Sequence, residues 1–69
     1  MKTVKIGRFG QQLKEIAFSD GENVNDALTA AKETLKKGET LTIDGETVRG
    51  SYVFEDGDVI IIEASTTGA

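Results

Sequence analysis

The feature that most constrains the fold is a run of four β-branched residues, Val59-Ile60-Ile61-Ile62, late in a chain of 69 residues. Such residues favour strands, and an unbroken apolar run is typical of a strand that is not half exposed to water. We therefore expect a central strand, paired on both edges and covered on at least one face. A chain of this length forms one domain and buries only about 60% of its unfolded surface, so the core around this strand is small.

One helix is predicted upstream of this strand, because the hydrophobic period changes there from two to about 3.6. Asn23 is a good N-cap, Asp26 stands where a capping box requires an acid, and Gly38 supplies a left-handed stop. The apolar stripe consists of Val24, Ala27, Leu28, Ala31 and Leu35. Three lysines stand where the helix dipole favours cations: Lys32, Lys36 and Lys37.

The other segments predict short strands. Residues 3–9 and 13–18 alternate as an antiparallel hairpin, with Leu13 out of phase, at a bulge or at the hairpin rim. Asp44-Gly45 indicates a tight hairpin between 40–43 and 46–48, and 52–54 is strand-like or irregular. We expect an α+β domain, a mixed sheet of four to five strands with the helix across one face and strands 3–9 and 59–62 as parallel neighbours.

Composition excludes most catalytic chemistry. The chain has no cysteine and no histidine, so thiol nucleophiles, imidazole proton transfer and the usual zinc sites are absent. We expect no enzyme activity, no catalytic residue, no cofactor and no metal. Asp56-Gly57-Asp58 and Asp44-Gly45-Glu46 lack the ligand pattern of a calcium loop and are interpreted as turns. The longest apolar run is far too short for a membrane span, and a cytoplasmic protein is the default expectation.

Charge is unevenly distributed. The net charge of −4 argues against nucleic-acid or membrane partners, yet residues 1–14 contain only basic charges. The basic residues of this segment are Lys2, Lys5, Arg8 and Lys14. They could form a basic face for an acidic partner or RNA, although a solvated outer strand face is the favoured interpretation. One parity of 59–62 faces the helix. The other is either a docking or dimer surface, or is partly covered by Tyr52 and Phe54.

Three segments resemble the β-grasp or ubiquitin-like sulfur carriers of thiamin and molybdopterin synthesis. They are Asn23-Val24-Asn25-Asp26-Ala27-Leu28, Ile43-Asp44-Gly45-Glu46-Thr47-Val48 and Glu55-Asp56-Gly57-Asp58-Val59-Ile60-Ile61-Ile62. The resemblance implies a β-grasp fold. It also implies a protein partner, such as an enzyme that adenylates the terminal carboxylate before its conversion to a thiocarboxylate, or a synthase that accepts the sulfur. TGS-type RNA-associated domains share the turn and the strand.

The last residues depart from that family, whose carriers end in Gly-Gly where this sequence has Gly68-Ala69. We therefore predict a β-grasp domain over 1–64 and a flexible tail over 65–69. The favoured function is a non-catalytic ubiquitin-like protein that binds other proteins, as a monomer or weak dimer. The alternatives are a working sulfur carrier, with Gly68 and Ala69 as its modified tail, and a TGS-like module. The partner-binding candidates are Val59, Ile60, Ile61, Ile62, Thr66 and Thr67.

Overall fold

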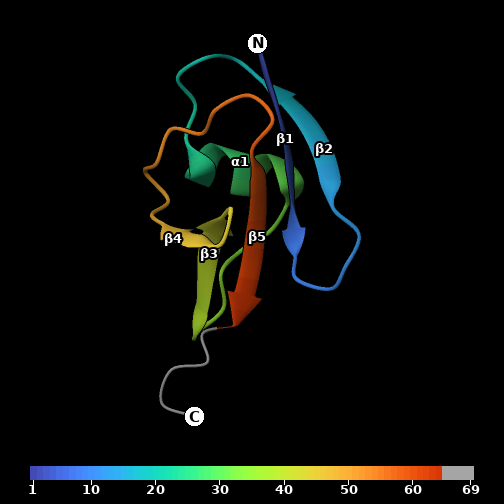
Figure 1. Ribbon diagram of the computed structural model, residues 1–69, viewed down its shortest axis with the longest axis vertical. Helices are drawn as coiled ribbons and strands as arrows, with labels where there is room; N and C mark the ends of the chain where they lie inside the picture. The colour runs from blue at the N-terminus through green and yellow to red at the C-terminus, as the bar shows by residue number, and fades with distance from the viewer. Residues whose placement is uncertain (65–69) are drawn as a thin grey trace.

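A computed structural model describes residues 1–64 of the chain (Figure 1). Its elements are β1 (Lys2–Arg8), β2 (Lys14–Phe18), α1 (Val24–Ala31), β3 (Glu39–Ile43), β4 (Glu46–Val48) and β5 (Val59–Ala64). The sheet order is β2-β1-β5-β3-β4, in which β5 pairs in parallel with β1 and antiparallel with β3. This confirms the predicted central strand and its parallel neighbour.

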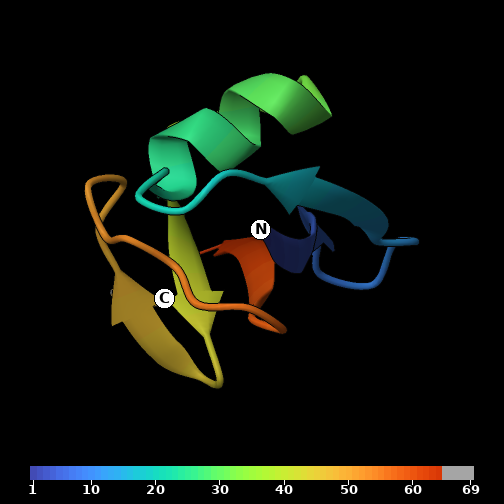
Figure 2. The same ribbon diagram turned by 90° about the horizontal axis from the view of Figure 1, so that it is seen from above.

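The molecule has two layers, with α1 packed across one face of the sheet (Figure 2). The core lies between these layers, and it includes Phe54, which contacts Phe18 edge-to-face with ring centroids 5.2 Å apart. Phe18 is the core residue of β2, and the other members come from β1, α1, β3 and β5: Val4, Ile6, Val24, Ala27, Leu28, Ala31, Leu41, Ile43, Ile60 and Ile62. The predicted fold class, a mixed sheet with one helix across one face, is confirmed.

The start of α1 agrees with the sequence. Asn23 and Asp26 form a capping box, each side chain accepting a hydrogen bond from the other's backbone N–H. The free amides of the first turn are also satisfied from a distant loop: the Val24 N–H donates to the Tyr52 carbonyl and the Asn25 N–H to the Gly50 carbonyl, both at 2.9 Å. The loop after β4 is therefore tied to the helix N-terminus.

The end of α1 differs from the prediction. The helix stops at Lys32, which adopts a left-handed conformation with φ of 59°, so Gly38 lies in the following loop. Leu35, assigned to the apolar stripe, is 43% exposed. The basic charge at the helix C-terminus comes instead from β2, because Lys14 Nζ donates to the Ala31 carbonyl at 2.8 Å.

Two further short segments are the turn between β3 and β4 and residues 52–54. Asp44 and Gly45 form the predicted two-residue hairpin between β3 and β4, both with positive φ (53° and 82°), as a type I′ turn requires. Residues 52–54 are irregular and make one isolated bridge, from Val53 to Asn23. Phe54 is fully buried and anchors this segment in the core.

Candidate functional site

The face of the sheet opposite α1 is the candidate site, because no helix or strand within residues 1–64 covers it (Figure 2). Alternation along β5 divides the predicted binding residues between the two faces. Ile60 and Ile62 are buried under α1, whereas Val59 and Ile61 lie on the open face and are half-buried. Two of the four candidates in this strand are thus core residues, since the side-chain period of a strand allows only one parity on each face.

A glycine in β1 explains how a loop residue joins this face. Gly7 pairs with Ile61, and a Cβ atom placed on Gly7 would lie 2.8 Å from Leu13 Cδ2. The Leu13 side chain therefore occupies the space that a larger residue in β1 would fill. Leu13 precedes β2 at the rim of the hairpin, which was one of the two predicted positions. Its departure from the strand period reflects this packing onto the open face.

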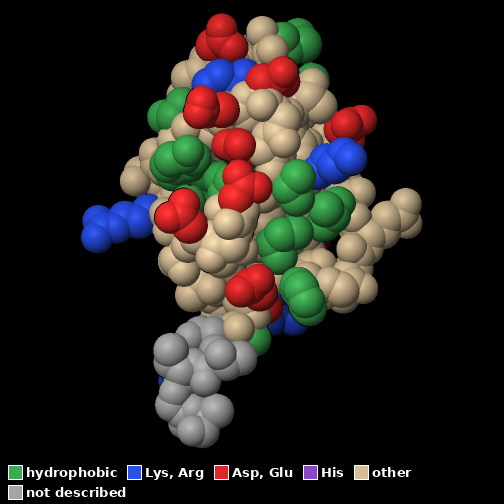
Figure 3. Space-filling view, in the orientation of Figure 1, with side chains coloured by type: hydrophobic (Ala, Val, Ile, Leu, Met, Phe, Trp, Pro, Cys, Tyr) green, Lys and Arg blue, Asp and Glu red, His purple; other side chains and the backbone are tan. Residues whose placement is uncertain are grey.

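Phe9 extends the apolar surface beyond the end of β1. Its N–H donates to the Ile62 carbonyl at 2.9 Å, and its side chain is 75% exposed. Together four residues make what we call the open-face patch: Phe9, Leu13, Val59 and Ile61. In the space-filling view, hydrophobic side chains gather over β5, β1 and the β1–β2 loop (Figure 3).

Charged residues border the open-face patch. In the register of the sheet, Lys5 of β1 lies opposite Glu15 of β2 on one side and opposite Val59 of β5 on the other. Glu63 lies beyond Ile61 on the same side of β5. An apolar centre with a charged rim is the usual anatomy of a protein–protein interface.

The four basic residues predicted as one face are divided between the two sides of the sheet. Lys5 alone lies on the open face. The Lys14 ammonium binds the end of α1, and the Lys2 ammonium donates to the Phe54 carbonyl at 2.8 Å. Arg8 donates to the Thr34 carbonyl at 2.7 Å. The structure therefore brings no continuous basic face together from these residues.

Arg8 also forms the main ion pair described for the domain. Its guanidinium hydrogen-bonds the Glu39 carboxylate and lies 3.4 Å from that of Glu33. The Arg8 hydrogen bond, helped by the Lys36 backbone N–H, holds the pKa of Glu39 below its usual value. Conversely, the hydrogen bond to Glu39 raises the pKa of Arg8. These contacts fasten the segment after α1 to β1, which is a structural role.

The remaining predicted site residues, Thr66, Thr67, Gly68 and Ala69, lie outside the described residues. Within the described part of the chain, no group of three or more acidic side chains is arranged to hold a metal ion. No helix there is long and apolar enough to cross a membrane.

Phe9 and Leu13 are interface candidates that the sequence did not indicate as such. A signal was present, because a glycine inside an alternating strand often marks the close approach of another group. Gly7 and the out-of-phase Leu13 belong to one packing arrangement, because the Leu13 side chain lies over the backbone of Gly7.

Comparison with known proteins supports the fold. No protein-family model matches the sequence, and no curated protein matches it significantly. Among solved structures, the chain is similar to the ubiquitin of Caldiarchaeum subterraneum, with a TM-score of 0.67 and 20% identity over 99% of this chain and 98% of that one. Together with the mixed five-stranded sheet and single helix, this likeness shows that the chain has the ubiquitin-like β-grasp fold.

Proposed function

We propose that this chain is a non-catalytic ubiquitin-like protein that acts by binding another protein through the open-face patch. The observation that carries the proposal is the position of Ile61, a large aliphatic side chain at the centre of the sheet that α1 does not cover. Apolar side chains on a sheet face need a covering layer, and a partner protein would supply one. Phe9 and Leu13 enlarge the apolar surface.

The test compares Ile61→Asp with Leu35→Asp, which places the same charge at an exposed apolar residue outside the patch. Each variant is used to capture binding proteins from cells of the source organism, after circular dichroism has shown that it is folded. We expect a partner retained by the wild type and by Leu35→Asp and lost with Ile61→Asp. Capture of the same proteins by all three would refute the proposal, and sedimentation of the wild type checks for self-association.

The sulfur-carrier alternative stays a prediction, and its residues Gly68 and Ala69 are tested by mass. Incubation with an adenylating enzyme, ATP and a sulfur donor should add about 16 Da, one sulfur in place of one oxygen, if the terminal carboxylate reacts. An unchanged mass, with a Gly-Gly carrier modified in parallel, would exclude it for that enzyme. The TGS-like alternative also stays a prediction. It finds no support in the basic residues, because Lys5 lies on the open face while Lys2, Arg8 and Lys14, on the other side of the sheet, each bond a different backbone carbonyl of this domain.

A further inference from the structure

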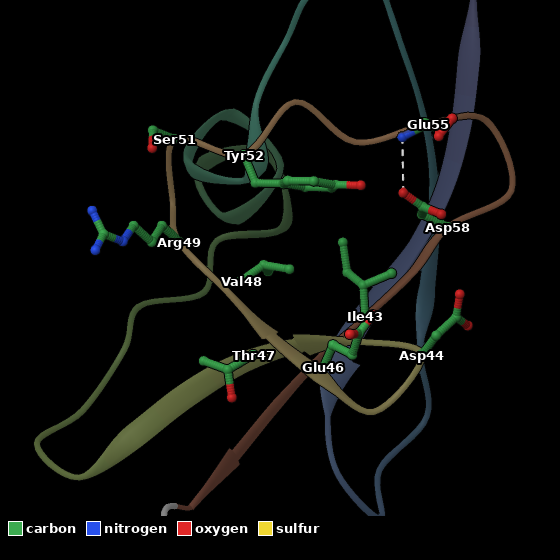
Figure 4. Close-up of a pocket in the computed structure, with 10 residues that line it drawn as sticks. All are labelled: Ile43, Asp44, Glu46, Thr47, Val48, Arg49, Ser51, Tyr52, Glu55 and Asp58. Carbon is green, nitrogen blue, oxygen red and sulfur yellow. Dashed lines mark hydrogen bonds between the residues drawn. The ribbon is translucent and has the colours of Figure 1, made fainter.

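A second surface lies on the helix side of the sheet, where the loop after β4 passes over the outer strand. It is a groove of about 550 Å³ between this loop and β4 (Figure 4). Its apolar part consists of Ile43, Val48 and Tyr52. Tyr52 is 41% exposed, and its ring lies across the groove above Val48 and Ile43. A flat aromatic face therefore stands opposite two aliphatic side chains.

The rim of this groove is acidic. Four carboxylates line it, together with one basic residue, Arg49, whose side chain points away from the groove (Figure 4). The carboxylates are Asp44, Glu46, Glu55 and Asp58. None of them takes part in an ion pair within residues 1–64. Asp58 accepts a hydrogen bond from the Glu55 backbone N–H at 2.8 Å, which fixes its position beside the groove. An apolar slot with this border is complementary to a cation on an aliphatic stem.

The edge of the sheet next to the groove is also open. β4 is the last strand in the sheet order, and β3 is its one paired neighbour among the described residues. Thr47, in the middle of β4, is exposed. An extended segment added along β4 would place alternate side chains on the groove side, beside Glu46 and Val48.

We propose that the groove binds an arginine side chain from an extended segment of a partner protein lying along β4. The planar guanidinium stacks on the Tyr52 ring and hydrogen-bonds the rim carboxylates, while its methylene stem covers Val48. The second inward side chain of the segment, two residues away, is apolar. This surface is independent of the open-face patch, which lies on the other side of the sheet.

The probe is the blocked peptide Ser-Arg-Ser-Val-Ser, titrated into the isotope-labelled full chain and followed by two-dimensional NMR. We expect shifts at Thr47, Val48 and Tyr52, saturating at millimolar peptide. A matched peptide with citrulline in place of arginine keeps the shape and removes the charge, and should bind about tenfold more weakly.

Two variants test the groove itself. Asp44→Asn combined with Glu46→Gln removes two rim charges, and asparagine tolerates the positive φ at position 44. We expect about fivefold weaker binding, since exposed charge pairs contribute modestly. Glu15→Gln with Glu63→Gln changes the net charge equally on the open face and should leave affinity unchanged. Tyr52→Leu keeps an apolar side chain but loses the aromatic face, and should weaken binding about threefold.

Several outcomes would overturn the proposal. They are no shifts at millimolar peptide, equal affinity for the citrulline peptide, equal weakening by the two double variants, or shifts centred on Val59 and Ile61. Ile61→Asp should bind the peptide as the wild type does. The proposal for the groove and the proposed function of the open-face patch can therefore be refuted independently of each other.

Discussion

Adjacent isoleucines in β5 provide a direct test of which face of the sheet is open. Ile60→Val and Ile61→Val each remove one methyl group from neighbouring positions of the same strand. Ile60 is fully buried, so its variant should lose about 1 kcal/mol of unfolding free energy. Ile61 is half-buried on the open face, and we expect a loss of about 0.4 kcal/mol, because part of that side chain is already in water.

The same pair truncated to alanine enlarges the difference. Ile60→Ala should cost about 3.5 kcal/mol, a large part of the roughly 3 to 10 kcal/mol expected for a domain of this size. Ile61→Ala should cost about 1 kcal/mol. For the valine variants, the expected losses correspond to a fall in Tm of about 6 °C for Ile60→Val and about 2 °C for Ile61→Val.

Urea denaturation followed by far-ultraviolet circular dichroism measures these differences, with unchanged m-values as the check on two-state behaviour. The measurement is repeated at two protein concentrations, because association through the open face would make the stability of the wild type concentration-dependent. Equal losses at the two positions, independent of concentration, would show that Ile61 is covered within the monomer. The reasoning behind the open-face patch would then be refuted.

Three further predictions concern single contacts. Because Arg8 lowers the pKa of Glu39, the stability advantage of the wild type over Glu39→Gln should be complete at pH 7 and shrink as the pH falls below the ordinary glutamate pKa of about 4.3. A difference between the urea midpoints of the two proteins that stays constant from pH 7 to 3 would contradict this. Gly7→Ala should cost about 1 to 2 kcal/mol and shift the Leu13 methyl signals in NMR spectra, because the new Cβ displaces that side chain; unmoved methyl signals would disprove the packing. Asp44→Val should cost about 1 to 2 kcal/mol in urea denaturation because of the positive φ, whereas Asp44→Asn should be close to neutral, and equal effects would argue against the type I′ turn.

The sequence predicted those elements whose signals are local. The capping box at Asn23 and Asp26 and the turn at Asp44-Gly45 depend on residues a few positions apart, and both form as expected. The four-residue run in β5 could be placed at the centre of the sheet because β-branched residues favour strands, although only Ile60 and Ile62 of the run are buried.

The helix end could not be predicted locally. Leu35 continues the apolar period, yet the chain turns at Lys32 and the segment beyond is held by Arg8, which bonds the Thr34 carbonyl and Glu39. These partners lie 26 and 31 residues from Arg8, so no local pattern contains them. Tertiary contacts override helical periodicity here.

The candidate site was predicted only as two alternatives. The alternation of side chains along β5 divides its residues between the two faces of the sheet, but it does not say which residues face the helix. That choice depends on the pairing register of β5 with β1 and β3. Tyr52 and Phe54, considered as a cover for the open face, instead lie beside β4 and in the core. Their placement follows from the bonds between the 50–52 loop and the start of α1, which no short motif indicates.

The parallel pairing of β1 with β5 has a consequence for the order in which the domain can form during synthesis. The two hairpins, β1–β2 and β3–β4, become available early, but they are not neighbours in the sheet and meet only across β5. A ribosome-bound chain that ends before residue 59 therefore exposes Ile6 and Leu41 without the strand that joins their two hairpins. We expect such a nascent chain to remain sensitive to protease until 59–64 leave the exit tunnel, and folding then to be governed by contacts between distant parts of the chain.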